Sequence, residues 1–249
     1  MLTSPFFFYE RKVMDTVPTD KLFVAEKLTP LSESEATFFL KKAFLHVVGS
    51  EPSFEVLALL WAHSALEVGR WRYIHNNNWG NIKRLLGQKY TSYRCSEILK
   101  GKEVWFEPYH PQTFFAAWDT PLDGAIAYLE FLKNRKRYAK AWKALLTGDP
   151  SIYAHELKVA GYYTADEKRY TALVVKLTEE FKKKSATLLS WKPKEEPKST
   201  FNIKDIKIPE VDFKSAPGST DSIELKYKGF WDIVLGLFNK LFKILHIKK

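Results

Sequence analysis

The chain has 249 residues, of which 45% are hydrophobic and 15% aromatic, and its formal net charge is +10. This length and composition suit one domain with a good core, together with additional segments. The single cysteine, Cys95, excludes an internal disulfide, so folding does not depend on an oxidising compartment. The first residues, MLTSPFFFYERKVMDTVPTDK, lack a basic start followed by a long apolar run, so we predict no signal peptide.

In chain order, residues 1–31 form an N-terminal extension, and two predicted helices follow it. Ser32 and Glu35 form a capping box, which opens a helix that reaches about Val48. The next predicted helix covers residues 54–69 and is apolar on more than one face. A helix with this pattern should lie inside the domain.

Glu67 lies at the end of this apolar helix, just before Gly69, a residue that commonly ends helices. Burial would desolvate the Glu67 carboxyl and raise its pKa, which suits a general acid that protonates a leaving glycosidic oxygen. The alternative is an exposed carboxylate at the end of a surface helix. Spacing alone does not choose between the two.

A segment dense in aromatic and amide side chains follows Glu67. Trp71, Tyr73 and Trp79 offer flat apolar faces for sugar rings. Four asparagines offer paired donors and acceptors for hydroxyl and acetamido groups: Asn76, Asn77, Asn78 and Asn81. The alternative is a turn with core-packed tryptophans, since Asn and Gly are ordinary turn residues. The density of these side chains beside Glu67 favours a sugar-binding site.

One small sheet and further helices complete the predicted domain. KYTSYR, EVWFE and TFFAAW, between residues 88 and 118, have the character of strands, with a turn at residues 100–102. Three further helix starts are marked by capping residues: Thr120, for a helix to Arg137 or beyond; Asp149, for a helix ended by Gly161; and Thr164 with Glu167, for a helix to about Lys184. We therefore predict an α+β, mainly α, domain over residues 32–190, with a helical lobe and a small β-hairpin lobe.

The composition changes after this domain. Residues 191–228 are rich in Lys, Pro, Ser and Asp and are predicted to be an extended linker. Residues 229–249 are predicted to form a basic amphipathic helix, too polar for a transmembrane span. We expect residues 229–247 to dock on a membrane surface or on a partner such as a virion protein. Folding back onto the domain is the alternative.

Two further patterns have mainly structural interpretations. His63 and Glu67 stand four residues apart, but no HExxH motif or Cys/His pairing accompanies them, so we predict no metal and no cofactor. A basic stretch is interpreted as a solvated face, which makes nucleic acid an unlikely partner: Lys133, Arg135, Lys136, Arg137, Lys140 and Lys143.

Two motifs resemble those of a known family. E-x-G followed by NNNWGNIK and a hairpin, and then AGYYTADEKRYTALVVKL over residues 160–177, are similar to the glucosaminidase domains of glycoside hydrolase family 73, in the lysozyme-like superfamily. The resemblance covers roughly residues 33–184. Two departures concern the shape of the site, because Asn81 is inserted into the first motif and Tyr163 replaces a small alanine in the second.

The resemblance implies roles for several residues. It makes Glu67 the acid and places a second carboxylate at Glu97 in the hairpin, although Cys95 replaces the usual threonine there. Glu103 and Glu107 are the other carboxylates of the hairpin, and a solvated hairpin charge is the alternative for Glu97. The resemblance further implies that Tyr162 lines the site and assists the reactive intermediate, with a core aromatic as the alternative. The predicted substrate contacts are Trp71, Tyr73, Asn77, Asn78, Trp79, Tyr163 and Tyr170.

The implied substrate is peptidoglycan, cut at the glycosidic bond after GlcNAc in the GlcNAc-MurNAc strand. A lytic transglycosylase is the nearest alternative, and a structural virion protein or a membrane-disrupting lysin are others. A wall-cleaving enzyme without a signal peptide is most simply a bacteriophage product. We therefore expect it in a virion or the host cytoplasm, with its action in the periplasm or cell wall.

Overall fold

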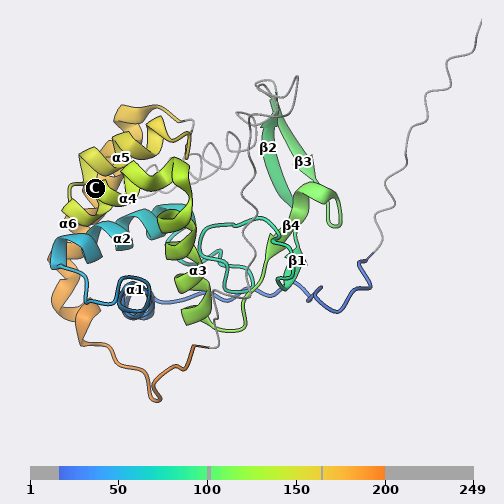
Figure 1. The fold of residues 1–249 in the computed structure, drawn as a ribbon, viewed down its shortest axis with the longest axis horizontal. Helices are drawn as coiled ribbons and strands as arrows, with labels where there is room; N and C mark the ends of the chain where they lie inside the picture. The colour runs from blue at the N-terminus through green and yellow to red at the C-terminus, as the bar shows by residue number, and fades with distance from the viewer. Residues whose placement is uncertain (1–16, 100–101, 164, 200–249) are drawn as a thin grey trace, which may run out of the picture.

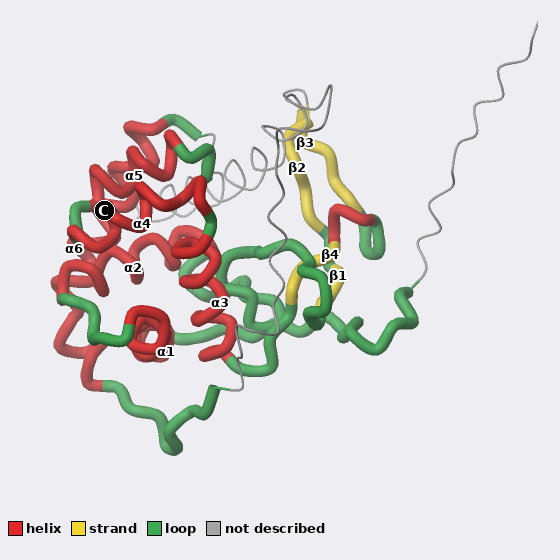
Figure 2. The backbone as a smooth tube through the Cα atoms, viewed as in Figure 1, coloured by secondary structure: helices red, strands yellow, loops and turns green. Residues whose placement is uncertain are grey.

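The computed structural model describes residues 17–99, 102–163 and 165–199, and these form a mainly helical domain (Figures 1 and 2). The α-helices of this described part are α1 (Glu33–Val48), α2 (Phe54–Glu67), α3 (Pro121–Asn134), α4 (Ala139–Thr147), α5 (Pro150–Val159) and α6 (Glu167–Ser190). Two short 3₁₀ helices, η1 (Pro111–Thr113) and η2 (Lys136–Tyr138), accompany them. The predicted mainly α architecture with a small β lobe is confirmed.

The strands lie to one side of the helices (Figure 1) and form two antiparallel pairs. β1 (Tyr90–Ser92) pairs with β4 (Phe114–Ala116), and β2 (Cys95–Leu99) pairs with β3 (Lys102–Phe106). The β2–β3 pair is the predicted hairpin, whereas β1 and β4 form its base next to the helical lobe.

Local capping explains where the helices begin. The Ser32 side chain accepts from the Glu35 backbone N–H, and the Glu35 carboxylate accepts from Ser32, which is the predicted capping box. Thr120 caps α3 and Asp149 caps α5, as predicted. α6 differs from the prediction, because its N-cap is Asp166 and it continues to Ser190.

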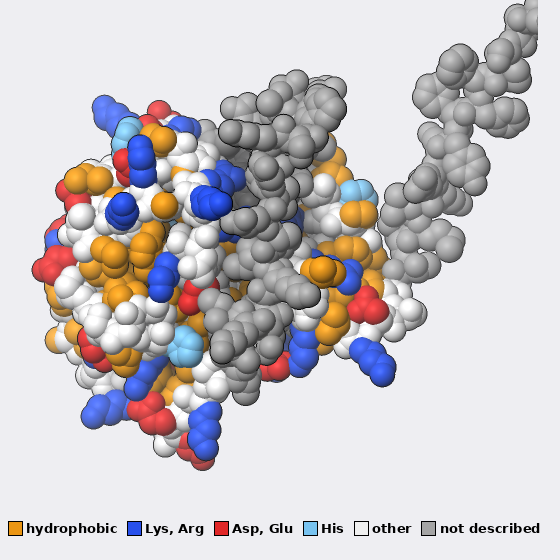
Figure 3. Space-filling view, in the orientation of Figure 1, with side chains coloured by type: hydrophobic (Ala, Val, Ile, Leu, Met, Phe, Trp, Pro, Cys, Tyr) orange, Lys and Arg blue, Asp and Glu red, His pale blue; other side chains and the backbone are white. Residues whose placement is uncertain are grey.

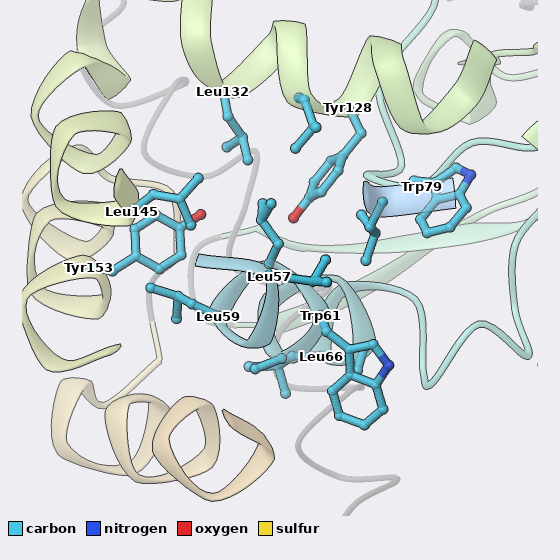
Figure 4. Close-up of a cluster of buried hydrophobic side chains, with 14 of the residues drawn as sticks. Leu57, Leu59, Trp61, Leu66, Trp79, Tyr128, Leu132, Leu145 and Tyr153 are labelled. Carbon is cyan, nitrogen blue, oxygen red and sulfur yellow. The ribbon is translucent and has the colours of Figure 1, made fainter. Parts of the chain in front are cut away.

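α2 lies at the centre of the domain and packs against α6, α1 and α4. Every residue from Val56 to Glu67 is buried. Figure 4 shows leucines and Trp61 leaving α2 on several sides, while Tyr128 of α3 and Tyr153 of α5 point toward the helix. The predicted internal position of this helix is confirmed, and its apolar surface on all sides is what this position requires.

The N-terminal extension contacts both lobes within residues 17–31. Phe23 forms a parallel bridge with Tyr90 of β1, and Leu28 forms an antiparallel bridge with His75. Leu31 N–H then donates to Trp71 O, just before α1. This segment therefore ties the β lobe to the loop that follows α2.

The beginning of the predicted linker contacts the helical lobe. Trp191 packs its ring 5.3 Å from that of Phe38, and Ser199 Oγ donates to Asp123 Oδ1 over 2.6 Å. The predicted amphipathic helix, residues 229–249, and linker residues 200–228 lie outside the described residues, as do residues 1–16 and the hairpin turn at 100–101.

Lys and Arg side chains are spread among acidic and apolar ones on the face shown in Figure 3. Two members of the basic stretch hold neighbouring elements together. Lys133 Nζ donates to Val47 O at the end of α1, and Arg137 donates to the carbonyl oxygens of Ala160 and Gly161. Part of this stretch is therefore structural.

Candidate active site

Glu67 is the last residue of α2, and its exposed fraction is 3%. The alternative of an exposed carboxylate at a helix end is therefore excluded. The chain that follows α2 runs toward the β strands (Figure 1), so the end of α2 that carries Glu67 lies on the side where the two lobes are connected.

His63 lies one turn before Glu67 and is fully buried. Its Nε2 atom is 3.1 Å from Glu67 Oε1, within ion-pair distance but with an alignment that falls short of hydrogen-bond geometry. Its Nδ1 atom faces two hydroxyls, Tyr128 Oη at 2.6 Å and Tyr153 Oη at 2.8 Å. The imidazole thus connects the Glu67 carboxyl to α3 and α5.

Buried tyrosines complete the surroundings of Glu67. Tyr162 is 6% exposed, and its hydroxyl acts on the Glu67 carboxyl and lowers the pKa of that carboxyl. Burial raises the pKa values of four tyrosine hydroxyls well above the ordinary value, and the negative charge of Glu67 adds to this effect. These hydroxyls belong to Tyr128, Tyr153, Tyr162 and Tyr170. These phenols are therefore neutral hydroxyls.

Desolvation raises the pKa of Glu67, and this effect outweighs the contacts with His63 and Tyr162, which lower it. The protonated carboxyl is thus favoured to a higher pH than in an ordinary glutamate. A carboxyl that keeps its proton is able to donate it to a leaving group, so this environment suits general acid catalysis.

The turn after Glu67 has an unusual backbone. Gly69, Arg70 and Trp71 all have positive φ, at 55°, 55° and 60°. This conformation is strained for the two residues that are not glycine. The Arg70 guanidinium donates to both oxygens of Glu180, over 2.9 and 2.6 Å, and this bidentate pair with α6 holds the turn in place.

The prediction that Trp71 and Trp79 stack on sugar rings is wrong, because both side chains are fully buried. Trp71 donates from Nε1 to Ser64 Oγ over 2.9 Å and packs its ring 5.0 Å from Trp61. Both tryptophans belong to the helical core, which was the alternative interpretation of the segment.

The prediction that Asn77 and Asn78 contact substrate is also corrected. Asn77 donates from Nδ2 to Trp118 O, and Asn78 donates from Nδ2 to Ile82 O and Ala116 O. Asn78 Oδ1 accepts from Ile82 N–H over 2.8 Å. Both residues are buried and their amides join the loop to the β lobe.

Two predicted contacts from the second motif are buried as well. Tyr163 and Tyr170 are 1% and 0% exposed, and their rings stack with centroids 3.7 Å apart. Tyr163 donates its hydroxyl proton to Ala154 O over 2.9 Å. The charge of Glu67 acts on the Tyr170 hydroxyl, and neither buried ring offers a face to a sugar.

Tyr73 is the predicted aromatic contact that has an open surface. It is 53% exposed, and its ring lies against Gly69, where an added Cβ would be 2.6 Å from the ring. A large exposed aromatic two residues beyond the strained turn keeps Tyr73 as a candidate sugar contact.

Glu97 lies in β2, where its backbone is opposite Val104 of β3, and its side chain lies outside the described part of the structure. The other hairpin carboxylates, Glu103 and Glu107, are exposed. Arg94 donates to Glu107 over 2.8 Å. The role of Glu97 as a second catalytic group stays a prediction.

The family profile described as glucosaminidase, mannosyl-glycoprotein endo-β-N-acetylglucosaminidase, matches residues 56–183. The chain belongs to this glucosaminidase family. It is therefore a glycoside hydrolase, as its two motifs predicted. The match begins two residues into α2 and ends within α6, so it includes Glu67, His63 and the surrounding tyrosines.

Two solved structures resemble the glucosaminidase chain. A crystal structure of a peptidoglycan hydrolase mutant from Sphingomonas sp. A1 has 19% identity and a TM-score of 0.47, covering 62% of this chain and 99% of that one. A crystal structure of peptidoglycan hydrolase from the same organism has 18% identity and a TM-score of 0.46, covering 66% and 100%. No curated protein matches the chain.

Within the described part of this glucosaminidase, no group of three or more His, Cys, Asp or Glu residues is arranged to hold a metal ion. None of the described helices is long and apolar enough to cross a membrane.

Sequence reasoning missed the contacts that surround Glu67 in the glucosaminidase domain. His63 was interpreted as a packing residue, although its spacing of four residues from Glu67 was a usable signal. Tyr128 and Tyr153 are 65 and 90 residues from His63 in the chain, and no local pattern indicates that they meet it.

Proposed function

We propose that this glycoside hydrolase cleaves the glycan strand of peptidoglycan after GlcNAc, with Glu67 as the general acid. The observation that carries this proposal is the buried Glu67 carboxyl, whose pKa is raised by desolvation among neutral tyrosine hydroxyls. The similarity of both motifs to family 73 glucosaminidases supports the cell-wall glycan as the substrate. On the basis of the sequence, we also propose that the enzyme is a bacteriophage product.

In the proposed reaction, protonated Glu67 donates its proton to the glycosidic oxygen as the bond to the anomeric carbon breaks. Positive charge develops on the sugar ring, and water then adds to the anomeric carbon. The reaction consumes one water molecule for each bond cleaved. In one route, a carboxylate such as Glu97 accepts a proton from the attacking water. In the other, the substrate's own N-acetyl group attacks the anomeric carbon first, and water then hydrolyses that intermediate. Tyr162, in contact with the Glu67 carboxyl, helps to orient the acid.

The test compares purified peptidoglycan clearing by the wild type and by Glu67→Gln. We expect kcat to fall by a factor of about 10² to 10⁴, because the variant has no proton to donate. Glu51→Gln is the control, since Glu51 is exposed before α2 and pairs with Lys41. Full activity of Glu67→Gln would contradict the proposal.

The stability of Glu67→Gln separates lost chemistry from lost folding. The raised pKa of Glu67 means that ionisation of the buried carboxyl opposes folding above the ordinary glutamate pKa. The variant should therefore have a melting temperature equal to or above that of the wild type at neutral pH, and the difference should shrink as the pH falls toward 4.5 and be lost below it.

Mass spectrometry of the released fragments determines the type of cleavage. Reducing ends at GlcNAc support the proposed hydrolysis. Anhydro-muramyl ends would instead identify a lytic transglycosylase, in which the muramyl 6-hydroxyl replaces water.

A further inference from the structure

His63 lies next to Glu67 in α2, although burial alone is enough to raise the pKa of the Glu67 carboxyl. His63 is fully buried and Glu67 is 3% exposed, and both point into the same group of tyrosines. Among the described residues, Nε2 of His63 has no hydrogen-bond partner, and Glu67 Oε1 lies 3.1 Å from it. The protonation of Nε2 therefore determines whether the Glu67 carboxyl faces an N–H donor or a nitrogen lone pair.

The two tyrosine hydroxyls determine where the imidazole proton lies. Tyr128 Oη and Tyr153 Oη approach the same Nδ1 atom, at 2.6 and 2.8 Å. In the described part of the chain, neither hydroxyl has another hydrogen-bond partner. If Nδ1 carried the proton, both buried O–H groups would lose their acceptor, which is costly. If Nδ1 is bare, its single lone pair accepts from one of the two hydroxyls or is shared between them, so the bare form leaves fewer O–H groups without an acceptor.

A neutral imidazole with a bare Nδ1 carries its proton on Nε2. This N–H then faces Glu67 Oε1 across 3.1 Å. Contacts of catalytic groups are often poorly aligned in the free enzyme and tighten when substrate binds, which fits the imperfect alignment of this pair.

We propose that His63 is a positioning residue, held in its Nε2–H form by Tyr128 and Tyr153, that reserves Oε1 of Glu67 as an acceptor and so places the transferable proton on Oε2. This inference rests on the proposed role of Glu67 as the acid. A carboxyl has two oxygens, and an acid that keeps its proton on one of them is already oriented for transfer.

The groups that face the pair come from several elements. Tyr128 belongs to α3, Tyr153 to α5 and Tyr170 to α6, and Tyr162 follows α5. All four are hydroxyls that stay neutral, because burial raises their pKa. The Nε2–H of His63 is thus a main influence on the ionisation of Glu67, and it lowers the Glu67 pKa against the larger effect of desolvation.

The first test is nuclear magnetic resonance of the unmodified full chain with ¹⁵N-labelled imidazoles at mildly alkaline pH. The His63 signal is identified by its loss in His63→Gln. We expect a proton on Nε2 and a bare Nδ1. A proton on Nδ1, or a doubly protonated ring, overturns the proposal. The position of the proton is measured in the wild type, and the variant serves only to assign the signal.

The second test compares the pH profiles of kcat/KM for peptidoglycan clearing. His63→Gln offers a carbonyl to the tyrosines and an N–H to Glu67, so it should keep the wild-type basic limb. His63→Phe offers neither, so its basic limb should shift upward by about one pH unit, and kcat should fall about tenfold or more with KM nearly unchanged.

The matched control is His155→Gln. His155 also faces a glutamate, with Nδ1 2.8 Å from Glu167 Oε1, but its side chain is 58% exposed and the pair lies on the surface. Its profile should match that of the wild type. If the wild type is active and folded His63→Phe has the same pH profile, the role of His63 is overturned and the proposed function stands. If the wild type is inactive, both the proposed function and the role of His63 are overturned.

Discussion

Asn78, in the loop that follows Glu67, has a structural role. Its amide uses both its nitrogen and its oxygen on the backbone of Ile82, and it also donates to Ala116 O in β4. Its neighbours Asn76 and Asn77 have positive φ, at 47° and 56°, a conformation that asparagine tolerates better than most residues. Backbone geometry therefore explains the asparagines of this loop.

We predict that Asn78→Ala lowers the free energy of unfolding by about 2 to 4 kcal/mol, because several buried backbone groups lose their partner at once. The measurement is urea unfolding followed by tryptophan fluorescence. Asn76→Ala is the control and should cost less, since the bonds of Asn76 to residues 25 and 27 are exposed. A stable Asn78→Ala with a raised KM would instead restore Asn78 as a substrate contact.

The internal position of the helix that carries Glu67 was predicted from sequence, and the partners of Glu67 were not. An apolar pattern on all sides of residues 54–67 indicates a buried helix whatever it packs against. Trp71 and Trp79 could not be assigned, because composition does not distinguish a tryptophan in the core from one in a binding site. The left-handed turn at Arg70 and Trp71 depends on the pairing of Arg70 with Glu180, 110 residues later.

At the scale of elements, the helix starts follow local chemistry and the helix ends do not. Caps at Ser32, Thr120 and Asp149 act within three residues, so sequence indicates them. α3 was expected to reach Arg137 or beyond, but Arg135 is extended, with φ −82° and ψ 120°. The helix ends there without proline or glycine, and η2 and α4 follow it.

Gly124 of α3 marks the closest approach between this helix and the loop that follows Glu67. A Cβ added at Gly124 would lie 1.8 Å from the backbone oxygen of Asn77. A backbone atom cannot move aside as a flexible side chain does. The glycine is therefore required for α3 to pack on the loop, despite its poor helix propensity.

We predict that Gly124→Ala destabilises the domain by about 3 kcal/mol or more, even though alanine favours a helix by about 1 kcal/mol over glycine. Thermal and urea unfolding measure this change. Gly87→Ala is the comparison, because Gly87 has a positive φ of 78° but no atom within 4 Å of an added Cβ. Equal stability of Gly124→Ala and the wild type would contradict the close packing of α3 on the loop.

At the scale of the whole molecule, contacts between distant segments hold the lobes and helices together. Residues 20–31 connect β1 to the loop after α2 through backbone bonds. A charged network does the same for the helical lobe. Glu180 and Lys184 of α6, Glu33 of α1 and Arg70 of the strained turn contact one another over 2.6 to 3.1 Å. Glu180 and Lys184 are four residues apart on α6, a spacing that sequence does indicate, whereas the other contacts join residues far apart in the chain and no sequence pattern indicates them.

This network gives the molecule a defined dependence on pH. The hydrogen bonds from Arg70 lower the pKa of Glu180 from 4.5 to about 2, with Lys184 contributing. A carboxyl with a lowered pKa stabilises the folded state above its unfolded pKa, and this stability is lost as the pH falls through its folded pKa. The contribution of Glu180 is thus complete above about pH 4.5 and disappears toward pH 2.

We predict that Glu180→Gln lowers the free energy of unfolding at neutral pH by about 1 to 2 kcal/mol, less than the full pKa shift implies, because Glu180 is partly exposed and solvent screens its charge. The loss should narrow as the pH falls from 4.5 and vanish near 2. Urea unfolding at a series of pH values measures it. Glu179→Gln is the control: Glu179 is 52% exposed and, within the described residues, pairs with Lys182 along α6, so it should cost less than about 0.5 kcal/mol. If the Glu180→Gln and wild-type stabilities differ by a constant amount from neutral pH to pH 2, the network does not hold the strained turn through the charge of Glu180.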